Sequence, residues 1–275
     1  MKNISLGYSP CPNDTFIFYA LVHKKVVGDM EFSEILRDVE TLNEMALSKK
    51  LEVTKASFHA FGFFREDYCL LHSGSALGKG CGPLIVAKKK MRISDLSGKT
   101  IAIPGKMTTA YLLLRLFAPY IKKIVEMPFD RIMNAVSLGT VDAGLIIHEG
   151  RFTYPAYDLV KLTDLGEWWE EETGLPIPLG GILAKRELGK DVIIEIDRLI
   201  KKSVEYAFGH REQTREYIKK YARELDDSVI DRHISLYVND YTVDIGDGAS
   251  AVDELLKKAE EINLIPHSDK PLFIY

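Results

Sequence analysis

His148 is the residue whose position in the sequence most clearly permits chemistry. It follows the apolar run Gly144–Ile147, which has the length of a short buried strand, so the imidazole is expected at the carboxyl end of that strand. An imidazole titrates near neutral pH and can accept a proton as a general base. The alternative is a hydrogen-bonded structural histidine, which the spacing alone slightly favours.

Three junctions between a strand and a helix carry polar residues that could bind a ligand. They are Ser9–Thr15, Lys55–Ser57 and Gly105–Thr109, where Thr108 or Thr109 can cap the following helix. Helix N-termini present unpaired backbone N–H groups and partial positive charge, which suit anions. Plain helix capping explains any one junction on its own. The three together favour a small anionic ligand.

Several motifs with known chemistry are absent or incomplete. Phe152 stands where a zinc-protease motif HExxH would need its second histidine. The Gly74–Lys79 segment is one residue short of a phosphate loop, and Gly80 replaces the required Ser or Thr. No GxGxxG follows the first expected strand, and no Cys/His spacing suits zinc. The sequence therefore predicts neither a cofactor nor a metal.

The elements that must position these residues alternate between strand-like and helix-like segments, which is typical of an α/β fold with a largely parallel sheet. After Leu188 the pattern is almost entirely helical. Strands are expected at 4–8, 30–36, 53–57, 84–87, 100–104, 124–127, 143–147 and 179–184, and helices at 15–22, 39–47, 58–65, 109–117, 131–138, 192–208, 211–223, 228–238 and 249–262.

The order of these elements predicts two lobes with a cleft between them. The chain is expected to cross between lobes near residues 85–92 and 178–185. The first lobe would then comprise residues 1–87 and 181–275, including the C-terminal helices, and the second lobe residues 88–180. Ligands of open α/β sheets lie beyond the carboxyl ends of the strands, where the three junctions and His148 are expected.

Composition narrows the class of partner. The 275 residues carry a net charge of −4, which argues against nucleic acid, because phosphate binding normally needs a concentrated basic surface. Three cysteines, Cys11, Cys69 and Cys81, leave no paired disulfide framework. The N-terminal segment lacks the apolar run of a secretory signal, and no stretch approaches the ~18 apolar residues of a membrane span. These features predict a cytoplasmic protein without a membrane partner.

Five segments together resemble the 1,4-dihydroxy-6-naphthoate synthase family of the futalosine route to menaquinone. The segments are Ser9–Phe16, Asp38–Asn43, Thr108–Tyr111, Gly144–Glu149 and Arg151–Pro155. They span most of the chain in order, and the first is the most distinctive. The helical region after Leu188 is less distinctive and contributes little.

The resemblance implies a fold, a reaction and a set of site residues. The fold would be that of type II periplasmic binding proteins, with a cleft between two lobes. The reaction would convert cyclic dehypoxanthinyl futalosine, a small carboxylate, into 1,4-dihydroxy-6-naphthoate by a carbon–carbon lyase step. His148 matches the family's proposed proton acceptor. The residues that contact the substrate in this family match two groups of residues in this sequence, Lys55, Ala56 and Ser57 in the first and Thr108 and Thr109 in the second.

Other functions remain open on the sequence. A non-catalytic binding protein for small carboxylates can share the fold, because fold does not decide function. A chorismate dehydratase of the same pathway is a second alternative, and the Ser9–Phe16 segment argues against it by resemblance only. The effector domain of a transcriptional regulator is a third, but no helix-turn-helix segment precedes the first strand.

Overall fold

The computed structural model describes residues 2–275, which divide into two compact units. The first unit runs up to Gly78 and resumes at Pro178, and the second comprises Lys79–Ile177. These divisions come earlier in the chain than expected. The strand Leu84–Ala87 pairs with strands of the second unit, so it does not end the first lobe at residue 87. Likewise, residues 178–180 belong to the first unit.

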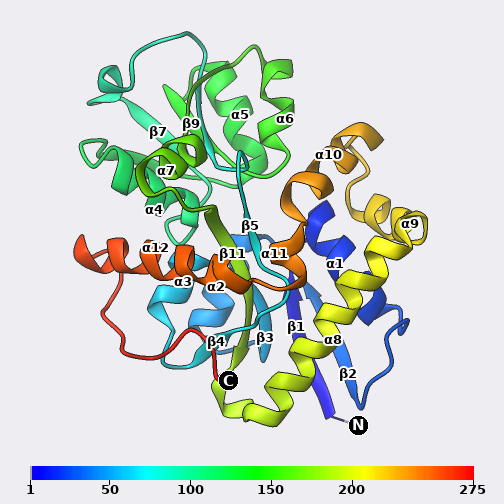
Figure 1. Cartoon of the computed structure of the whole chain (residues 1–275). Coiled ribbons are helices and arrows are strands. Elements are labelled where there is room, and N and C mark those ends of the chain that lie inside the picture. Colours follow the sequence, from blue (N-terminus) through cyan, green and yellow to red (C-terminus); the bar gives the residue numbers. More distant parts are fainter. Residues whose placement is uncertain (1) are drawn as a thin grey trace. The chain divides into compact units, whose positions relative to one another are not determined.

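The first unit is built on one mixed sheet flanked by helices (Figure 1). The strand order is β2-β1-β3-β11-β4, and β5 pairs with β11. Its strands are β1 (Lys2–Tyr8), β2 (Met30–Leu36), β3 (Val53–Ser57), β4 (Tyr68–Leu70), β5 (Ala76–Gly78) and β11 (Ile177–Lys185). Its α-helices are α1 (Pro12–Val22), α2 (Val39–Leu47), α3 (Phe58–Phe63), α8 (Lys190–Gly209), α9 (Arg211–Tyr221), α10 (Asp227–Tyr237), α11 (Asp240–Val243) and α12 (Ala249–Glu261).

The second unit has its own sheet, in the order β10-β6-β9-β7-β8. The strands are β6 (Leu84–Ala87), β7 (Thr100–Ile103), β8 (Lys123–Glu126), β9 (Ala143–Ile146) and β10 (Val160–Asp164). The α-helices are α4 (Thr109–Phe117), α5 (Phe129–Leu138), α6 (Gly150–Thr153) and α7 (Leu165–Thr173). Gly144 lets α5 pack closely on β9, because a Cβ there would lie 2.5 Å from Ile132.

The expectation of a largely parallel sheet is corrected, because both sheets are mixed. β1 runs parallel to β2 and β3, and β7 runs parallel to β8 and β9. β11 is antiparallel to β3 and β4, and β6 is antiparallel to β9 and β10. The strands β3 and β11 come from distant parts of the chain, so no helical crossover between them imposes a parallel direction.

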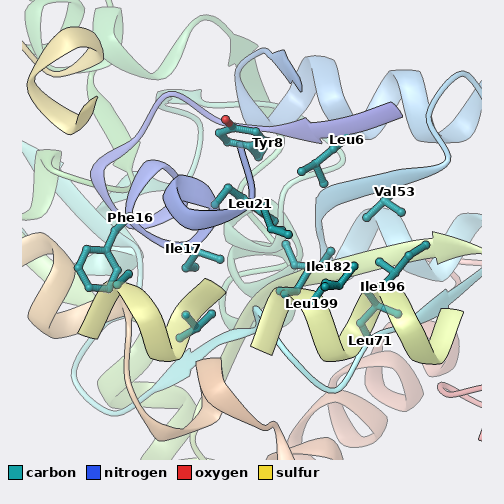
Figure 2. Packing of buried hydrophobic residues seen from close by; sticks show 14 of the residues in the cluster. Leu6, Tyr8, Phe16, Ile17, Leu21, Val53, Leu71, Ile182, Ile196 and Leu199 are labelled. Carbon is teal, nitrogen blue, oxygen red and sulfur yellow. The ribbon is translucent and has the colours of Figure 1, made fainter. Parts of the chain in front are cut away.

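The main core lies in the first unit, between the sheet and the helices α1 and α8. Leu6 and Val53 come from the sheet, Ile17 from α1, and Ile196 and Leu199 from α8 (Figure 2). In α8 the buried positions recur at intervals of three and four residues, which gives the helix one apolar face. A separate cluster in the second unit includes Val86, Ile132 and Ile146. None of the helices in residues 2–275 is long and apolar enough to cross a membrane.

Candidate functional site

The parallel pairing of β1 and β3 brings two of the three predicted junctions to the same edge of the first sheet. Leu6 and Gly7 of β1 lie opposite Val53 and Thr54 of β3. The segment that follows Tyr8 and the end of β3 at Ser57 therefore lie at one edge. α1 begins at Pro12 rather than at residue 15, because proline suits the first turn of a helix.

Lys55 is a buried lysine that contacts a carboxylate and a carbonyl. Its side chain is 8% exposed, and its Nζ lies 3.6 Å from Asp14 Oδ1. The same Nζ donates a hydrogen bond of 3.2 Å to the carbonyl of Gly74. Side chains alternate along a strand, so the side chain of Ala56 lies on the face opposite to that of Lys55. Ala56 can share a ligand with Lys55 only through its backbone.

Ser57 does not use its hydroxyl to cap the helix that follows it. Although it occupies the N-cap position of α3, its side chain makes no capping hydrogen bond. Asn43 of α2 contacts it instead. The Asn43 Oδ1 accepts from the backbone N–H of Ser57 at 3.0 Å, and Nδ2 donates to Ser57 Oγ at 3.3 Å. Plain helix capping is therefore not the role of this hydroxyl.

In the second unit, the parallel pairing of β7 and β9 brings the third junction and His148 to one edge of the sheet. These strands are parallel neighbours, with Ile101 opposite Ala143. The loop after β7 leads to Thr108 and Thr109, and His148 follows the end of β9, so all three lie beyond the same edge of this sheet. Thr108 is the residue that caps α4: its Oγ1 accepts from Tyr111 N–H at 3.2 Å and donates to the Gly105 carbonyl at 2.7 Å. Thr109 is 2% exposed at the first position of the helix.

His148 has an unusual backbone conformation. Its φ of 54° lies in the left-handed region, which a residue with a Cβ rarely adopts. Its ring lies 5.3 Å from the ring of Phe129, the first residue of α5, at an interplanar angle of 56°. Non-glycine residues in this conformation store strain and cluster at functional sites. Lys24, Lys49, Asp158 and Asn263 have a similar φ, so this conformation alone does not separate a site residue from the structural histidine that spacing slightly favoured.

An ion pair fixes the short segment that follows His148. The Arg151 Nη2 donates to Asp164 Oδ2 at 2.5 Å, and Nη1 donates to the Gly82 carbonyl at 2.7 Å. The Asp164 side chain is fully buried and also caps α7 by accepting from the backbone N–H groups of Gly166 and Glu167. Arg151 thus ties the turn after β9 to two other segments of the second unit.

Each unit therefore contributes its own set of predicted residues. Lys55, Ala56 and Ser57 belong to the first unit, and Thr108, Thr109 and His148 to the second. Sequence reasoning did not assign roles to the buried Asp14 and Asn43, although both lie in the segments that carry the family resemblance. In residues 2–275, no group of three or more His, Cys, Asp or Glu side chains is arranged to hold a metal ion.

Comparison with known proteins identifies the family. A family model described as menaquinone biosynthesis matches residues 4–261. The chain is 49% identical over 275 residues to the 1,4-dihydroxy-6-naphthoate synthase of Thermus thermophilus, and the match covers all of both chains. The chain belongs to the menaquinone biosynthesis family. A second family member with the same name, from Streptomyces coelicolor, is 45% identical and covers 96% of this chain and 95% of its own.

Solved structures agree on the fold of this family member. A protein from Archaeoglobus fulgidus is 40% identical, with a TM-score of 0.91 over 96% of this chain and 98% of its own. The alkanesulfonate-binding protein of Xanthomonas axonopodis pv. citri is 15% identical, with a TM-score of 0.71 over 97% of this chain and 95% of its own. The second likeness concerns the fold alone. The expected periplasmic-binding-protein-like α/β fold with a helical C-terminal part is confirmed, as is the expectation of an enzyme of menaquinone biosynthesis.

Proposed function

We propose that the chain is a 1,4-dihydroxy-6-naphthoate synthase that acts on cyclic dehypoxanthinyl futalosine. The full-length identity to two relatives with this name supports the product. The resemblance in the segments Ser9–Phe16 and Gly144–Glu149 supports the substrate. The same relatives favour this reaction over the dehydration of chorismate. A cytoplasmic location stays a prediction from the sequence.

The observation that carries the mechanism is the place of His148 just after β9, beyond the same sheet edge as Thr108 and Thr109. We infer that His148 is the general base. It would remove a proton from the cyclic substrate, and the electron pair left behind would drive the cleavage of a carbon–carbon bond. The released fragment would take up a proton, and the bicyclic product becomes aromatic. Aromatisation makes the sequence favourable, so the protein has to supply one base and a fixed orientation of the substrate. As proposed, this mechanism needs neither a metal nor a redox cofactor.

The residues at the β7–α4 junction would bind the substrate carboxylate. Thr108 sets the start of α4 by capping it, and Thr109 lies directly at the first helical position. An anion at that position would lie at the positive end of the helix dipole. A carboxylate bound there would lie beyond the same sheet edge as His148.

The residues of the first unit would supply further substrate contacts. Lys55 brings a buried positive charge, and Ser57 a hydroxyl that Asn43 holds in place. Ala56 would contribute through its backbone, since its side chain faces away from that of Lys55. Such polar groups on otherwise apolar elements are typical of sites that fix the orientation of a small ligand.

The direct test is to incubate the purified protein with cyclic dehypoxanthinyl futalosine and follow the naphthoate product by chromatography and mass spectrometry. We expect product formation that depends on the protein. A non-catalytic binding protein would bind the substrate and form no product. A chorismate dehydratase would leave the cyclic substrate unchanged and consume chorismate in a parallel incubation.

A further inference from the structure

Asp14 is the centre of a buried polar network that no part of the mechanism above uses. Its Oδ2 accepts from the backbone N–H of Ser9 at 3.1 Å and from Ser9 Oγ at 2.7 Å. Its Oδ1 accepts from Asn13 Nδ2 at 3.0 Å and lies 3.6 Å from Lys55 Nζ. Asp14 is 1% exposed and Lys55 6%. The two residues therefore form an ion pair that is almost completely shielded from water.

The network continues beyond Asp14 to the C-terminal helices. Asn13 Oδ1 lies 3.0 Å from Nε2 of His233, a fully buried residue of α10. Because the Asn13 amide nitrogen donates to Asp14, its oxygen must accept, which assigns the proton to Nε2 of His233. The network runs from α10 through Asn13 and Asp14 at the start of α1 to β3. The orientation of the Asp14 carboxylate is thus fixed from several sides.

The ammonium of Lys55 has more hydrogens than these partners use. It carries three N–H groups, of which one donates to Gly74 and a second faces Asp14. One N–H group remains to donate to a bound anion. A buried ammonium needs a counter-charge close by, and Lys55 faces the carboxylate of Asp14, so this carboxylate fixes where the ammonium points.

We propose that Asp14 is a positioning residue, which holds the Lys55 ammonium in place for a polar group of the substrate, with Ser9, Asn13 and His233 fixing Asp14 in turn. This inference rests on the proposed function, because it takes Lys55 as a substrate contact. The alternative is that Asp14 only stabilises the start of α1. The two roles differ in their effect on substrate binding, since only the first acts through Lys55.

The test compares Asp14→Asn with a matched control in the same sheet. Glu52, just before β3, also accepts from the backbone N–H and the Oγ of one serine, Ser5, at 2.8 and 3.1 Å. No ion pair joins Glu52 to a basic side chain of residues 3–275. We expect Asp14→Asn to raise KM for cyclic dehypoxanthinyl futalosine about 10- to 100-fold with little change in kcat. Glu52→Gln should change KM less than about twofold.

A double-mutant cycle with Lys55→Met separates positioning from stability. If Asp14 acts through Lys55, then Asp14→Asn should change kcat/KM by less than about twofold once Lys55 is replaced. Partial unfolding would instead reduce the active fraction, which lowers kcat and leaves KM unchanged. Thermal unfolding of the same four proteins checks that each is folded at the assay temperature.

A milder pair of variants covers the case in which Asp14→Asn does not fold. Ser9→Ala removes one donor to Asp14, and Ser5→Ala removes the equivalent donor to Glu52. Ser9→Ala should raise KM about threefold or more in the parent and not in Lys55→Met, whereas Ser5→Ala should leave KM unchanged. If the protein forms product but KM is unaltered in both Asp14→Asn and Ser9→Ala, the inference about Asp14 is wrong and the proposed function still holds. Absence of product from the parent protein would overturn the proposed function.

Discussion

The side-chain amide of Asn43 makes two hydrogen bonds to Ser57, one to its backbone N–H and one to its hydroxyl oxygen. Asn43 is fully buried, and its Nδ2 also donates to Glu40 Oε2 at 3.1 Å. Because the Ser57 oxygen accepts from Asn43, its own hydrogen points elsewhere. That hydrogen is then available to an anionic group of the substrate.

Replacing this amide by a carboxylate should redirect the Ser57 hydroxyl. In Asn43→Asp the new carboxylate can accept from both the backbone N–H and the hydroxyl of Ser57, so the hydroxyl no longer donates to the substrate. We expect KM to rise about tenfold, which corresponds to the loss of a hydrogen bond to a charged group. Steady-state kinetics measure this. Adding Glu40→Gln removes the repulsion between the two carboxylates, and a KM that then returns to normal would contradict the account.

Substitutions of the adjacent residues Thr108 and Thr109 should have different effects, the first on the free energy of unfolding and the second on substrate binding. Thr108 caps α4, so Thr108→Val should lower the free energy of unfolding by about 1 kcal/mol. Thr109→Val should raise KM about tenfold, because it loses a hydroxyl contact to the substrate carboxylate. Urea unfolding and steady-state kinetics on both variants test the contrast. Normal KM in Thr109→Val would leave only the backbone amides as carboxylate donors.

Arg151 should affect turnover more than binding. Its guanidinium fixes the segment after His148 through Asp164 and Gly82, and a lysine cannot reproduce both contacts. We expect Arg151→Lys to lower kcat about tenfold with a small change in KM, because the imidazole would be displaced from its productive position. Lys161→Met is the control, since it removes only the exposed ion pair with Glu167. Equal kinetics for the two variants would show that the tie to Asp164 does not position His148.

The thiols of Cys69 and Cys81 should be unreactive in the native protein. Burial raises the pKa of Cys69 to about 11 and that of Cys81 to about 12. At pH 8 only about one Cys69 thiol in a thousand is then ionised, and the thiolate is the reactive form. Labelling with a thiol reagent, followed by mass spectrometry of the peptides, should show slow modification at both positions and rapid modification after unfolding. Rapid labelling of either cysteine in the folded protein would contradict this.

The same raised pKa values have a consequence for stability. The folded protein holds these thiol protons more tightly than the unfolded chain does, in which a thiol titrates near pH 8.5. The free energy of unfolding should therefore fall as the pH rises above about 8.5, and the loss should continue towards the folded pKa values of about 11 and 12.

Local sequence patterns predicted many elements well and their pairing poorly. The strand Val53–Ser57 and the helices Val39–Leu47 and Thr109–Phe117 have the predicted bounds, because caps and side-chain periodicity are local signals. The helix α7 was missed, although Asp164 at its N-cap and Gly174 just after it are ordinary helix signals. The antiparallel direction of β11 against β3 depends on contacts between distant residues, which a local pattern does not contain.

The same limit applies to the site. The position of His148 after a buried strand was predictable, because the strand is a short apolar run immediately before it. Its left-handed backbone was not, since no glycine or turn motif marks it. The contacts of Asp14 with Lys55 and of Asn43 with Ser57 join residues of different elements. They follow from the pairing of β1 with β3 and from the packing of α1 and α2.

The most direct test of the account is the turnover of His148→Asn on cyclic dehypoxanthinyl futalosine across a range of pH. A positioned base contributes ~10²–10⁴-fold to rate, so kcat should fall on that scale while KM changes much less. In the parent protein the rate should rise with pH as an imidazole near neutrality loses its proton, and that rise should disappear in the variant. A folded His148→Asn protein with nearly normal turnover and an unchanged pH profile would contradict the assignment of His148 as the general base.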